Sequence, residues 1–126
     1  MIRLSSAVLS ALLVTTAAGA QQPERQTEML PPVRVSLEAK DFGFAPNEVV
    51  VPKERMVLLT VTNGGTMVHN VEVLLNGAKV KFENPLAPGE VQTLSFRAPQ
   101  QAGRYEIYCP LEDHRARGMK AALVVR

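Results

Sequence analysis

The sequence has little of what most metal or disulfide proteins carry: one cysteine and two histidines among 126 residues. A single cysteine excludes an internal disulfide. The net charge of +2 is small, and it argues against a nucleic-acid-binding protein, which would carry a clustered basic face. The one apolar run near the N-terminus, from Ala7 to Thr16, is too short to cross a bilayer comfortably. We find no internal repeat and no stretch with a convincing helical period.

The first twenty residues have the pattern of an export signal. Arg3 is a basic n-region, the apolar run follows it, and Ala18-Gly19-Ala20 is a small-residue cleavage site. We therefore expect residues 1–20 to be a signal peptide and the mature chain to begin at Gln21 in the periplasm. An uncleaved anchor is the alternative, although no stop-transfer flank follows the run. No cysteine follows the cleavage site directly, which excludes a lipidated N-terminus.

The remainder of the sequence predicts a tail and one β domain. Residues 21–32 are rich in Gln, Glu and Pro without apolar periodicity, so we expect a flexible tail. Short alternating runs then follow at 33–38, 48–51, 55–62, 69–75, 79–82, 91–96, 104–109 and 120–125, separated by turn residues such as Asn76-Gly77. We predict an all-β fold over residues 33–126, a Greek-key antiparallel β-sandwich of seven to eight strands. The only helical turn expected lies near 113–117.

The residues able to bind a metal gather in two short segments. Cys109, His114 and Met119 are evenly spaced in a loop between the last two expected strands, and His69 stands at the start of an earlier strand. A loop of this length can bring its three side chains to one point, and His69 can join them from a neighbouring strand end. One thiolate, two imidazoles and one thioether form a ligand set typical of copper.

Each of these residues also has an ordinary structural interpretation. Cys109 alone is typical of a small buried hydrophobe, and Met119 alone of a core filler. The combination favours a metal site, because every His and Cys of the chain falls within it. Zinc is an alternative, with Glu112 or Asp113 as a general base beside an open coordination position. Methionine is a poor zinc ligand, however, and a thiolate with a thioether favours copper.

On these residues the sequence resembles the cupredoxins, small blue copper proteins that include plastocyanin, azurin, pseudoazurin, auracyanin and rusticyanin. The resemblance runs from Asp41-Phe42-Gly43-Phe44-Ala45-Pro46, through Thr60-Val61-Thr62-Asn63-Gly64-Gly65 and His69-Asn70, to the C-terminal loop. The Cys-x4-His-x4-Met spacing is similar to that of auracyanin and rusticyanin, whereas plastocyanin and pseudoazurin have a shorter Cys-to-His interval.

The resemblance implies one type 1 copper ion and a role for each ligand. His69, Cys109 and His114 would form the trigonal plane, with Met119 as the weak axial ligand. Asn70 would brace the ligand loop and donate a hydrogen bond toward the cysteine sulfur, a contact that tunes redox potential. Met67 lies near His69 in the sequence, but we interpret it as loop packing because Met119 has the axial place of the family.

The family also implies how partners reach the copper. The second histidine, here His114, would come to the surface through an apolar patch where redox partner proteins dock. Its sequence neighbours Glu112, Asp113, Arg115 and Arg117 form a rim of mixed charge. Asp113 departs from the family pattern, in which Gly or Pro often precedes this histidine.

The expected function is that of an exported one-electron carrier cycling between Cu(I) and Cu(II), and not an enzyme. We expect a monomer that binds no nucleic acid and no membrane after signal cleavage. A periplasmic copper-binding or delivery protein without redox turnover is the alternative. Delivery would be favoured by many additional Met or His residues, and the mature chain has only Met29, Met56 and Met67 beyond the site. A copper enzyme is disfavoured because no histidine is left for a further copper centre.

Overall fold

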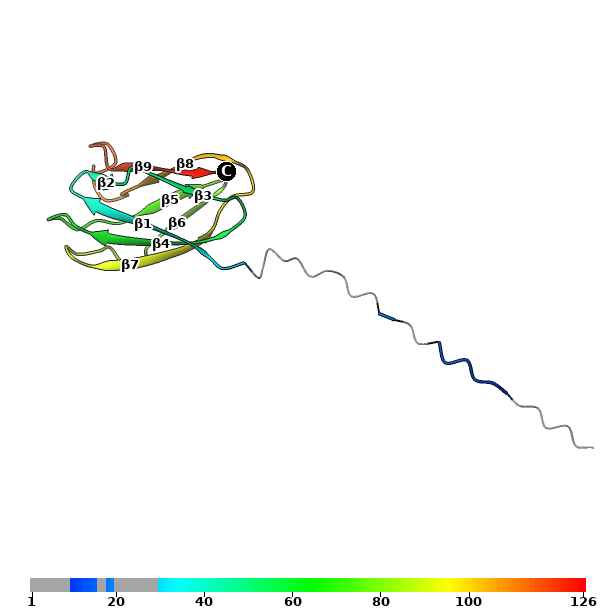
Figure 1. Ribbon diagram of the computed structural model, residues 1–126. Coiled ribbons are helices and arrows are strands. Elements are labelled where there is room, and N and C mark those ends of the chain that lie inside the picture. The colour runs from blue at the N-terminus through cyan, green and yellow to red at the C-terminus, as the bar shows by residue number, and fades with distance from the viewer. Residues whose placement is uncertain (1–9, 16–17, 20–29) are drawn as a thin grey trace, which may run out of the picture.

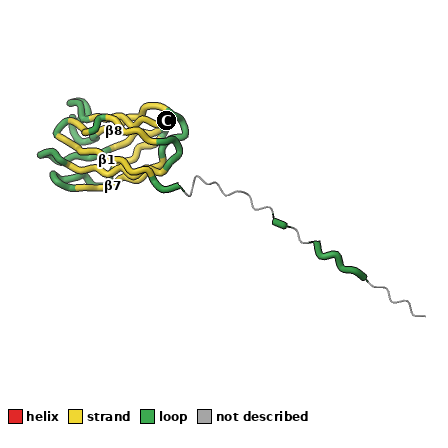
Figure 2. The backbone as a smooth tube through the Cα atoms, viewed as in Figure 1, coloured by secondary structure: helices red, strands yellow, loops and turns green. Residues whose placement is uncertain are grey.

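The computed structural model describes residues 10–15, 18–19 and 30–126. These residues form nine strands and no helix (Figures 1 and 2). The strands are β1 (Val33–Lys40), β2 (Gly43–Ala45), β3 (Glu48–Val51), β4 (Met56–Asn63), β5 (Glu72–Leu75), β6 (Ala78–Lys81), β7 (Val91–Arg97), β8 (Gly103–Tyr108) and β9 (Lys120–Val125). The predicted signal peptide at 1–20 and tail at 21–32 lie largely outside the described residues. Within the described part, no helix is long and apolar enough to span a membrane.

The strands form two sheets that pack as a sandwich, which confirms the predicted all-β sandwich. One sheet has the order β2-β1-β4-β7 and the other the order β3-β9-β8-β5-β6. Two details differ from the prediction. The described strands number nine rather than seven or eight, and the sheets are mixed, because β1 pairs with β4 and β3 with β9 in parallel. Alternation reports which face of a strand is buried and carries no information on the direction of its neighbour.

Alternating burial explains why the strands form where they do. In β4 the side chains of Val57, Leu59 and Val61 are fully buried, while the residues between them face outward. Leu94 and Phe96 of β7 are buried in the same way, as their alternation with polar residues predicted. The inward faces of the two sheets join in one hydrophobic core, which excludes water and fixes the register of each strand.

The additional strand and one altered boundary both lie near the candidate site. The segment after Lys40, expected to be only a break, turns and returns as the short strand β2 beside the end of β1. The strand expected from His69 begins only at Glu72. His69 instead forms an isolated antiparallel bridge with Leu86. The chain is thus extended at His69 but held by a loop rather than by a sheet neighbour.

The candidate ligands lie at one end of the sandwich, opposite the C-terminus (Figure 1). Strand β8 ends at Tyr108, directly before Cys109, and β9 begins at Lys120, directly after Met119. These two strands are antiparallel with Tyr108 opposite Lys120, so the connecting loop closes over this end. The turn predicted near 113–117 is present in this loop, where the Arg117 N–H donates to the Asp113 carbonyl at 3.0 Å.

We predict that Leu59→Ala lowers the free energy of unfolding by about 2–5 kcal/mol. The side chain is fully buried between the sheets, and its loss leaves a cavity in a packed core. Leu30→Ala is the matched control, because Leu30 precedes β1 and is 48% exposed, and we expect a change within about 0.5 kcal/mol. Urea denaturation followed by circular dichroism measures both values, and equal losses would contradict the assignment of Leu59 to the core.

Candidate metal centre

Three of the four predicted ligands converge in the structure. One ligand atom from each of His69, Cys109 and His114 lies within 4.8 Å of the other two. The Cys109 Sγ is 3.4 Å from His114 Nδ1, and the two imidazole rings have centroids 5.1 Å apart. All three side chains are buried, with exposed fractions of 2% or less. A thiol and two imidazoles thus share one water-excluded point.

Backbone hydrogen bonds hold Met119 beside the same cluster. The Cys109 N–H donates to the Met119 carbonyl at 3.2 Å, extending the β8–β9 ladder by one pair. The Met119 N–H donates to the His114 carbonyl at 3.0 Å. The methionine side chain is fully buried and belongs to the hydrophobic core. Gly118 precedes it with φ of +102°, a conformation that a side chain rarely tolerates.

His69 is fixed by a separate network centred on Asn63. The His69 backbone exchanges two hydrogen bonds with Leu86, at 3.1 and 2.7 Å. The buried Asn63 side chain donates to the carbonyls of Leu86 and Met67, and it accepts from the Gly65 N–H at 2.9 Å. One amide therefore joins the end of β4 to both segments that flank His69. The sequence alone did not reveal this role of Asn63, because its partners lie in segments distant along the chain.

The backbone of Asn70 approaches the cysteine sulfur. Its N–H donates to Cys109 Sγ at 3.5 Å within the buried interior. Its side chain points elsewhere, donating to the Phe82 carbonyl at 3.1 Å and accepting from the Val71 N–H at 2.7 Å. Hydrogen bonds to a ligating sulfur tune the redox potential of a metal, and here the donor is a main-chain group.

His114 is covered, contrary to the expectation that it reaches the surface. It is only 2% exposed, because the Phe42 ring meets its imidazole edge-to-face with centroids 5.4 Å apart. The Arg117 guanidinium lies 3.7 Å above the Phe42 ring, a cation–π contact. Phe42 has φ of +63°, an outlier for a bulky side chain. The sequence did not reveal this cover, since it depends on the turn after β1 folding against the C-terminal loop.

Two imidazole nitrogens in the cluster are buried without a hydrogen-bond partner among the described residues, His69 Nδ1 and His114 Nε2. Leaving such an atom unpaired costs about 1–3 kcal/mol. A ligand role for His69 explains its unpaired Nδ1, because the other ring nitrogen, Nε2, is already bonded to Asp41. In His114 the nitrogen that faces the cluster is Nδ1, which lies beside the Cys109 sulfur.

The residues present therefore fit one copper ion. The set combines a thiolate and two imidazoles with a methionine held nearby, which matches the ligand types of blue-copper sites. Glu112 and Asp113 also offer carboxylate oxygens that lie, with a His114 ring nitrogen, within 4.8 Å of one another. Both carboxylates are exposed, however, and exposed acidic groups often lie close together without a metal, so they add little to the zinc alternative. Glu112 Oε2 is 3.9 Å from His114 Nε2, too far for a hydrogen bond.

Asp41 contacts the cluster from outside, a role that no sequence motif indicated. Its Oδ1 lies 2.9 Å from His69 Nε2. The Thr66 hydroxyl and the His69 ring, the two largest contributions, hold the pKa of the Asp41 carboxyl far below its usual range. The carboxyl is consequently ionised at any physiological pH. The only sequence signal for this role of Asp41 was its position directly after strand β1, which ends beside the site.

A second charged pair lies beside the ligand loop. Arg115 donates to both oxygens of Glu106, at 2.9 and 2.6 Å, and its guanidinium lies 3.9 Å above the Tyr108 ring. The hydrogen bond from Arg115 lowers the pKa of the Glu106 carboxyl. Burial, followed by a hydrogen bond with Glu72, raises the pKa of Tyr108. This pair anchors the loop between Cys109 and Met119 to the outer face of β8.

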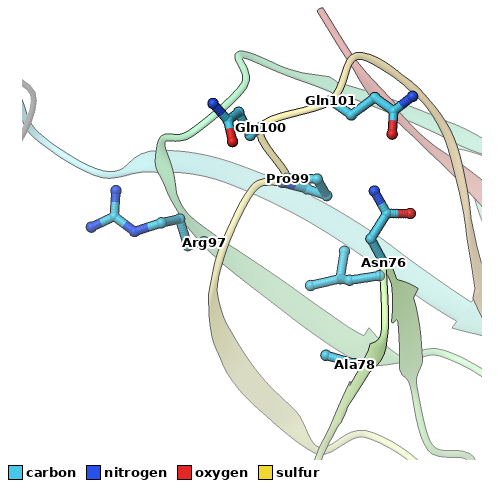
Figure 3. A pocket seen from close by; sticks show the side chains of 7 residues that line it. Asn76, Ala78, Arg97, Pro99, Gln100 and Gln101 are labelled. Carbon is cyan, nitrogen blue, oxygen red and sulfur yellow. The ribbon is translucent and has the colours of Figure 1, made fainter.

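A surface hollow lies away from the ligands, where the β5–β6 turn meets the segment before β8 (Figure 3). Its volume is about 520 Å³. It is lined by Leu75, Asn76, Ala78, Arg97, Pro99, Gln100 and Gln101. None of these is a candidate ligand, so the hollow and the buried cluster are separate features.

Solved structures of two auracyanins share this fold. Dithionite-reduced auracyanin from the photosynthetic bacterium Roseiflexus castenholzii is 21% identical, with 75% of this chain and 97% of that chain covered and a TM-score of 0.65. Auracyanin A, a "blue" copper protein from Chloroflexus aurantiacus, is 18% identical, with coverage of 76% and 100% and a TM-score of 0.66. At this level of identity the likeness establishes the fold alone.

Three further comparisons concern a larger copper protein, curated sequences and protein families. A multicopper oxidase structure is 18% identical with a TM-score of 0.59, and the match covers 74% of this chain but only 41% of the oxidase. Among curated proteins no significant sequence match is found. The sequence matches the family described as "Cupredoxin-like domain" over residues 6–125. Because that match spans nearly the whole sequence, the chain belongs to the cupredoxin-like domain family.

Proposed function

We propose that this protein is an exported blue copper protein that carries single electrons. The observation that carries the proposal is the buried cluster of His69, Cys109 and His114, within 4.8 Å of one another in a cupredoxin-like domain. When bound, copper supplies a one-electron couple between Cu(I) and Cu(II). His69, Cys109 and His114 are proposed as the ligands of the plane, and Met119 as the axial ligand.

The protein's contribution to electron transfer is a ligand set that moves little. Cys109, His114 and Met119 are connected through main-chain hydrogen bonds, and His69 is tied to Leu86 on both its N–H and its carbonyl. Both ligand segments emerge from a densely packed core, which resists displacement. Side chains held in this way keep similar positions in both oxidation states, so little reorganisation accompanies each transfer.

We propose that redox partner proteins dock at the end of the sandwich near His114. His114 itself is covered, so a partner would meet Phe42 and Arg117 above it. Val68, beside His69, is 47% exposed and adds an apolar side chain at the same end. We call Phe42, Val68 and Arg117 the site-end surface. An electron leaving through it would cross the edge-to-face contact between the His114 and Phe42 rings.

Copper delivery is the alternative role, and the burial of the ligands disfavours it. A delivery protein must release its ion to a partner, which is easier when ligands are exposed. Here each proposed ligand is at most 2% exposed, and all belong to the packed interior. An enzymatic role is disfavoured for a different reason. Both histidines of the chain are already in the cluster, so none is left for a second copper centre.

Export to the periplasm rests on the leader pattern. In the described part of the leader, Leu12, Leu13 and Val14 are 75–87% exposed and do not pack on the sandwich. A basic residue, a short apolar run and a small-residue cleavage site are the sequence pattern of a secretory signal peptide. We propose cleavage after Ala20 and a mature periplasmic protein.

We predict that the purified mature domain turns intensely blue on addition of Cu(II), with narrow copper hyperfine splitting in the electron spin resonance spectrum. The band comes from charge transfer between the Cys109 thiolate and copper. Cys109→Ser retains the size of the side chain but removes the thiolate, so the band should be lost. A colourless protein that takes only Cu(I), or prefers Zn(II), would contradict electron carriage and favour delivery.

We predict that Met119→Leu raises the reduction potential. Loss of a sulfur donor destabilises Cu(II) more than Cu(I), and each tenfold loss of preference for Cu(II) raises a one-electron potential by about 59 mV. The substitution nearly conserves volume and should cost less than about 1.5 kcal/mol of stability. Met67→Leu is the control, and spectroelectrochemical titration measures both. A larger shift of the reduction potential for Met67→Leu than for Met119→Leu would contradict the assignment of Met119 as the axial ligand.

We predict that Val68→Lys slows electron self-exchange by about tenfold at low ionic strength. Two copies meeting at the site-end surface would then bring the added lysines close to one another and to Arg117, and repulsion between these like charges reduces the rate of encounter. Val50→Lys is the control: Val50 is 45% exposed, close to the 47% of Val68, but lies on β3 near the C-terminal end of the sandwich. Line broadening in nuclear magnetic resonance of mixed Cu(I) and Cu(II) samples measures the rate. Equal decreases in the self-exchange rate for the two variants would show that the copies do not meet at the site-end surface.

A further inference from the structure

A carboxylate stands directly behind the first histidine of the site. Asp41 follows β1 in the chain and lies 28 positions before His69, yet its Oδ1 is 2.9 Å from His69 Nε2. The histidine side chain is fully buried, whereas that of Asp41 is 31% exposed. The carboxylate therefore forms the outer boundary of the site on the His69 side, between the imidazole and the solvent.

Asp41 is itself held by several donors from the segment that precedes His69. The Thr66 N–H donates to both carboxylate oxygens, at 3.0 and 3.1 Å, and the Thr66 hydroxyl donates to Oδ2 at 2.6 Å. The Met67 N–H adds a longer contact to Oδ1 at 3.3 Å. With both oxygens engaged, the carboxylate has little freedom to rotate, and the direction of its bond to His69 is set.

The neighbouring backbone leaves room for this pair only because residue 65 is glycine. A Cβ at Gly65 would lie 2.4 Å from Asp41 Oδ1 and 3.0 Å from His69 Nε2. The first distance is shorter than side-chain carbons show in proteins, so any larger residue would force the pair apart. The loop thus passes closely over the carboxylate–imidazole contact.

The chemistry of this contact selects one tautomer of the imidazole. An ionised carboxylate only accepts hydrogen bonds, so the proton of His69 must be on Nε2. In neutral His69 the lone pair is then on Nδ1, which is the buried atom without a hydrogen-bond partner. A metal ligand requires that lone pair, and a carboxylate bonded to the other nitrogen also raises ligand basicity.

We propose that Asp41 is a positioning residue of the copper site: it holds His69 in the tautomer that presents Nδ1, and its charge favours Cu(II) over Cu(I). The effect of the Asp41 charge on copper rests on the proposed electron-carrier function. The tautomer of His69 does not, because it can be measured in the protein without metal. A purely structural ion pair would stabilise the loop without affecting either the tautomer or the potential. These two quantities therefore distinguish the roles.

The first experiment measures the tautomer in the wild-type apoprotein. Long-range proton–nitrogen correlation spectra of nitrogen-15-labelled protein distinguish a protonated Nε2 from a protonated Nδ1. We expect His69 to be protonated on Nε2 and unprotonated on Nδ1. A proton on Nδ1 in the neutral ring would overturn the proposal whether or not the protein carries electrons, because no copper is present.

The second experiment removes the charge of Asp41. Asp41→Asn retains the shape and an oxygen that accepts from His69, so we expect the Nε2–H tautomer to persist while Cu(II) affinity falls about 10- to 100-fold. Because Cu(I) affinity should fall less than Cu(II) affinity, we expect the reduction potential to rise. The rise is about 59 mV for each factor of ten by which the loss of Cu(II) affinity exceeds the loss of Cu(I) affinity. Glu54→Gln controls for net charge, because Glu54 lies near Pro99 at the opposite end of the sandwich. A potential shift no larger than in this control would overturn the charge effect.

A milder variant covers the case in which Asp41→Asn does not fold. Thr66→Val removes the 2.6 Å hydroxyl contact but leaves the Asp41 charge and the two N–H contacts in place. We expect a second His69 tautomer to become detectable and Cu(II) affinity to fall by less than tenfold. A blue, well-folded Thr66→Val protein with a single unchanged tautomer and unchanged affinity would show that the anchoring of Asp41 does not position His69.

Discussion

The antiparallel pairing of β8 with β9 is the interaction on which the site depends. Its register places Tyr108 opposite Lys120, and the next hydrogen bond, from the Cys109 N–H to the Met119 carbonyl, continues the ladder into the ligand loop. A slip of one residue would turn Cys109 away from the interior, because successive side chains face opposite sides of a sheet. The burial of Ile107 and Leu123 prevents that slip, so the core determines where the sulfur lies.

The second requirement is to bring His69 to the same point from a distant part of the chain. The sheet does not do this, because β5 begins only at Glu72. A buried amide, Asn63, connects the end of β4 to the segments around Met67 and Leu86, and Leu86 in turn pairs with the His69 backbone. A polar network can hold a loop this firmly when all its members are bonded and shielded from water.

Burial and hydrogen bonding together give the centre its chemical character. The ligands are shielded from solvent by Phe42 and by the packed core, so contacts around them act in a medium of low polarity. In such a medium a main-chain donor to the Cys109 sulfur would influence the reduction potential of a bound copper ion. The partly exposed Asp41 carboxylate would add its charge from the outer side of His69. The ligand types are common to the cupredoxins, and the hydrogen bonds around the ligands complete the site in this chain.

The sequence by itself determined the ligand types and all of the strands except β2, although the start of β5 was placed too early. Alternation marked buried faces such as that of β4, and the conjunction of one cysteine with two histidines indicated copper, because both signals depend on residue type and local spacing. Only the tertiary structure decided the parallel pairing of β1 with β4, the cover over His114 and the contact of Asp41 with His69. Each of these depends on which distant segments pack together, and a local pattern of polar and apolar residues is compatible with many such arrangements.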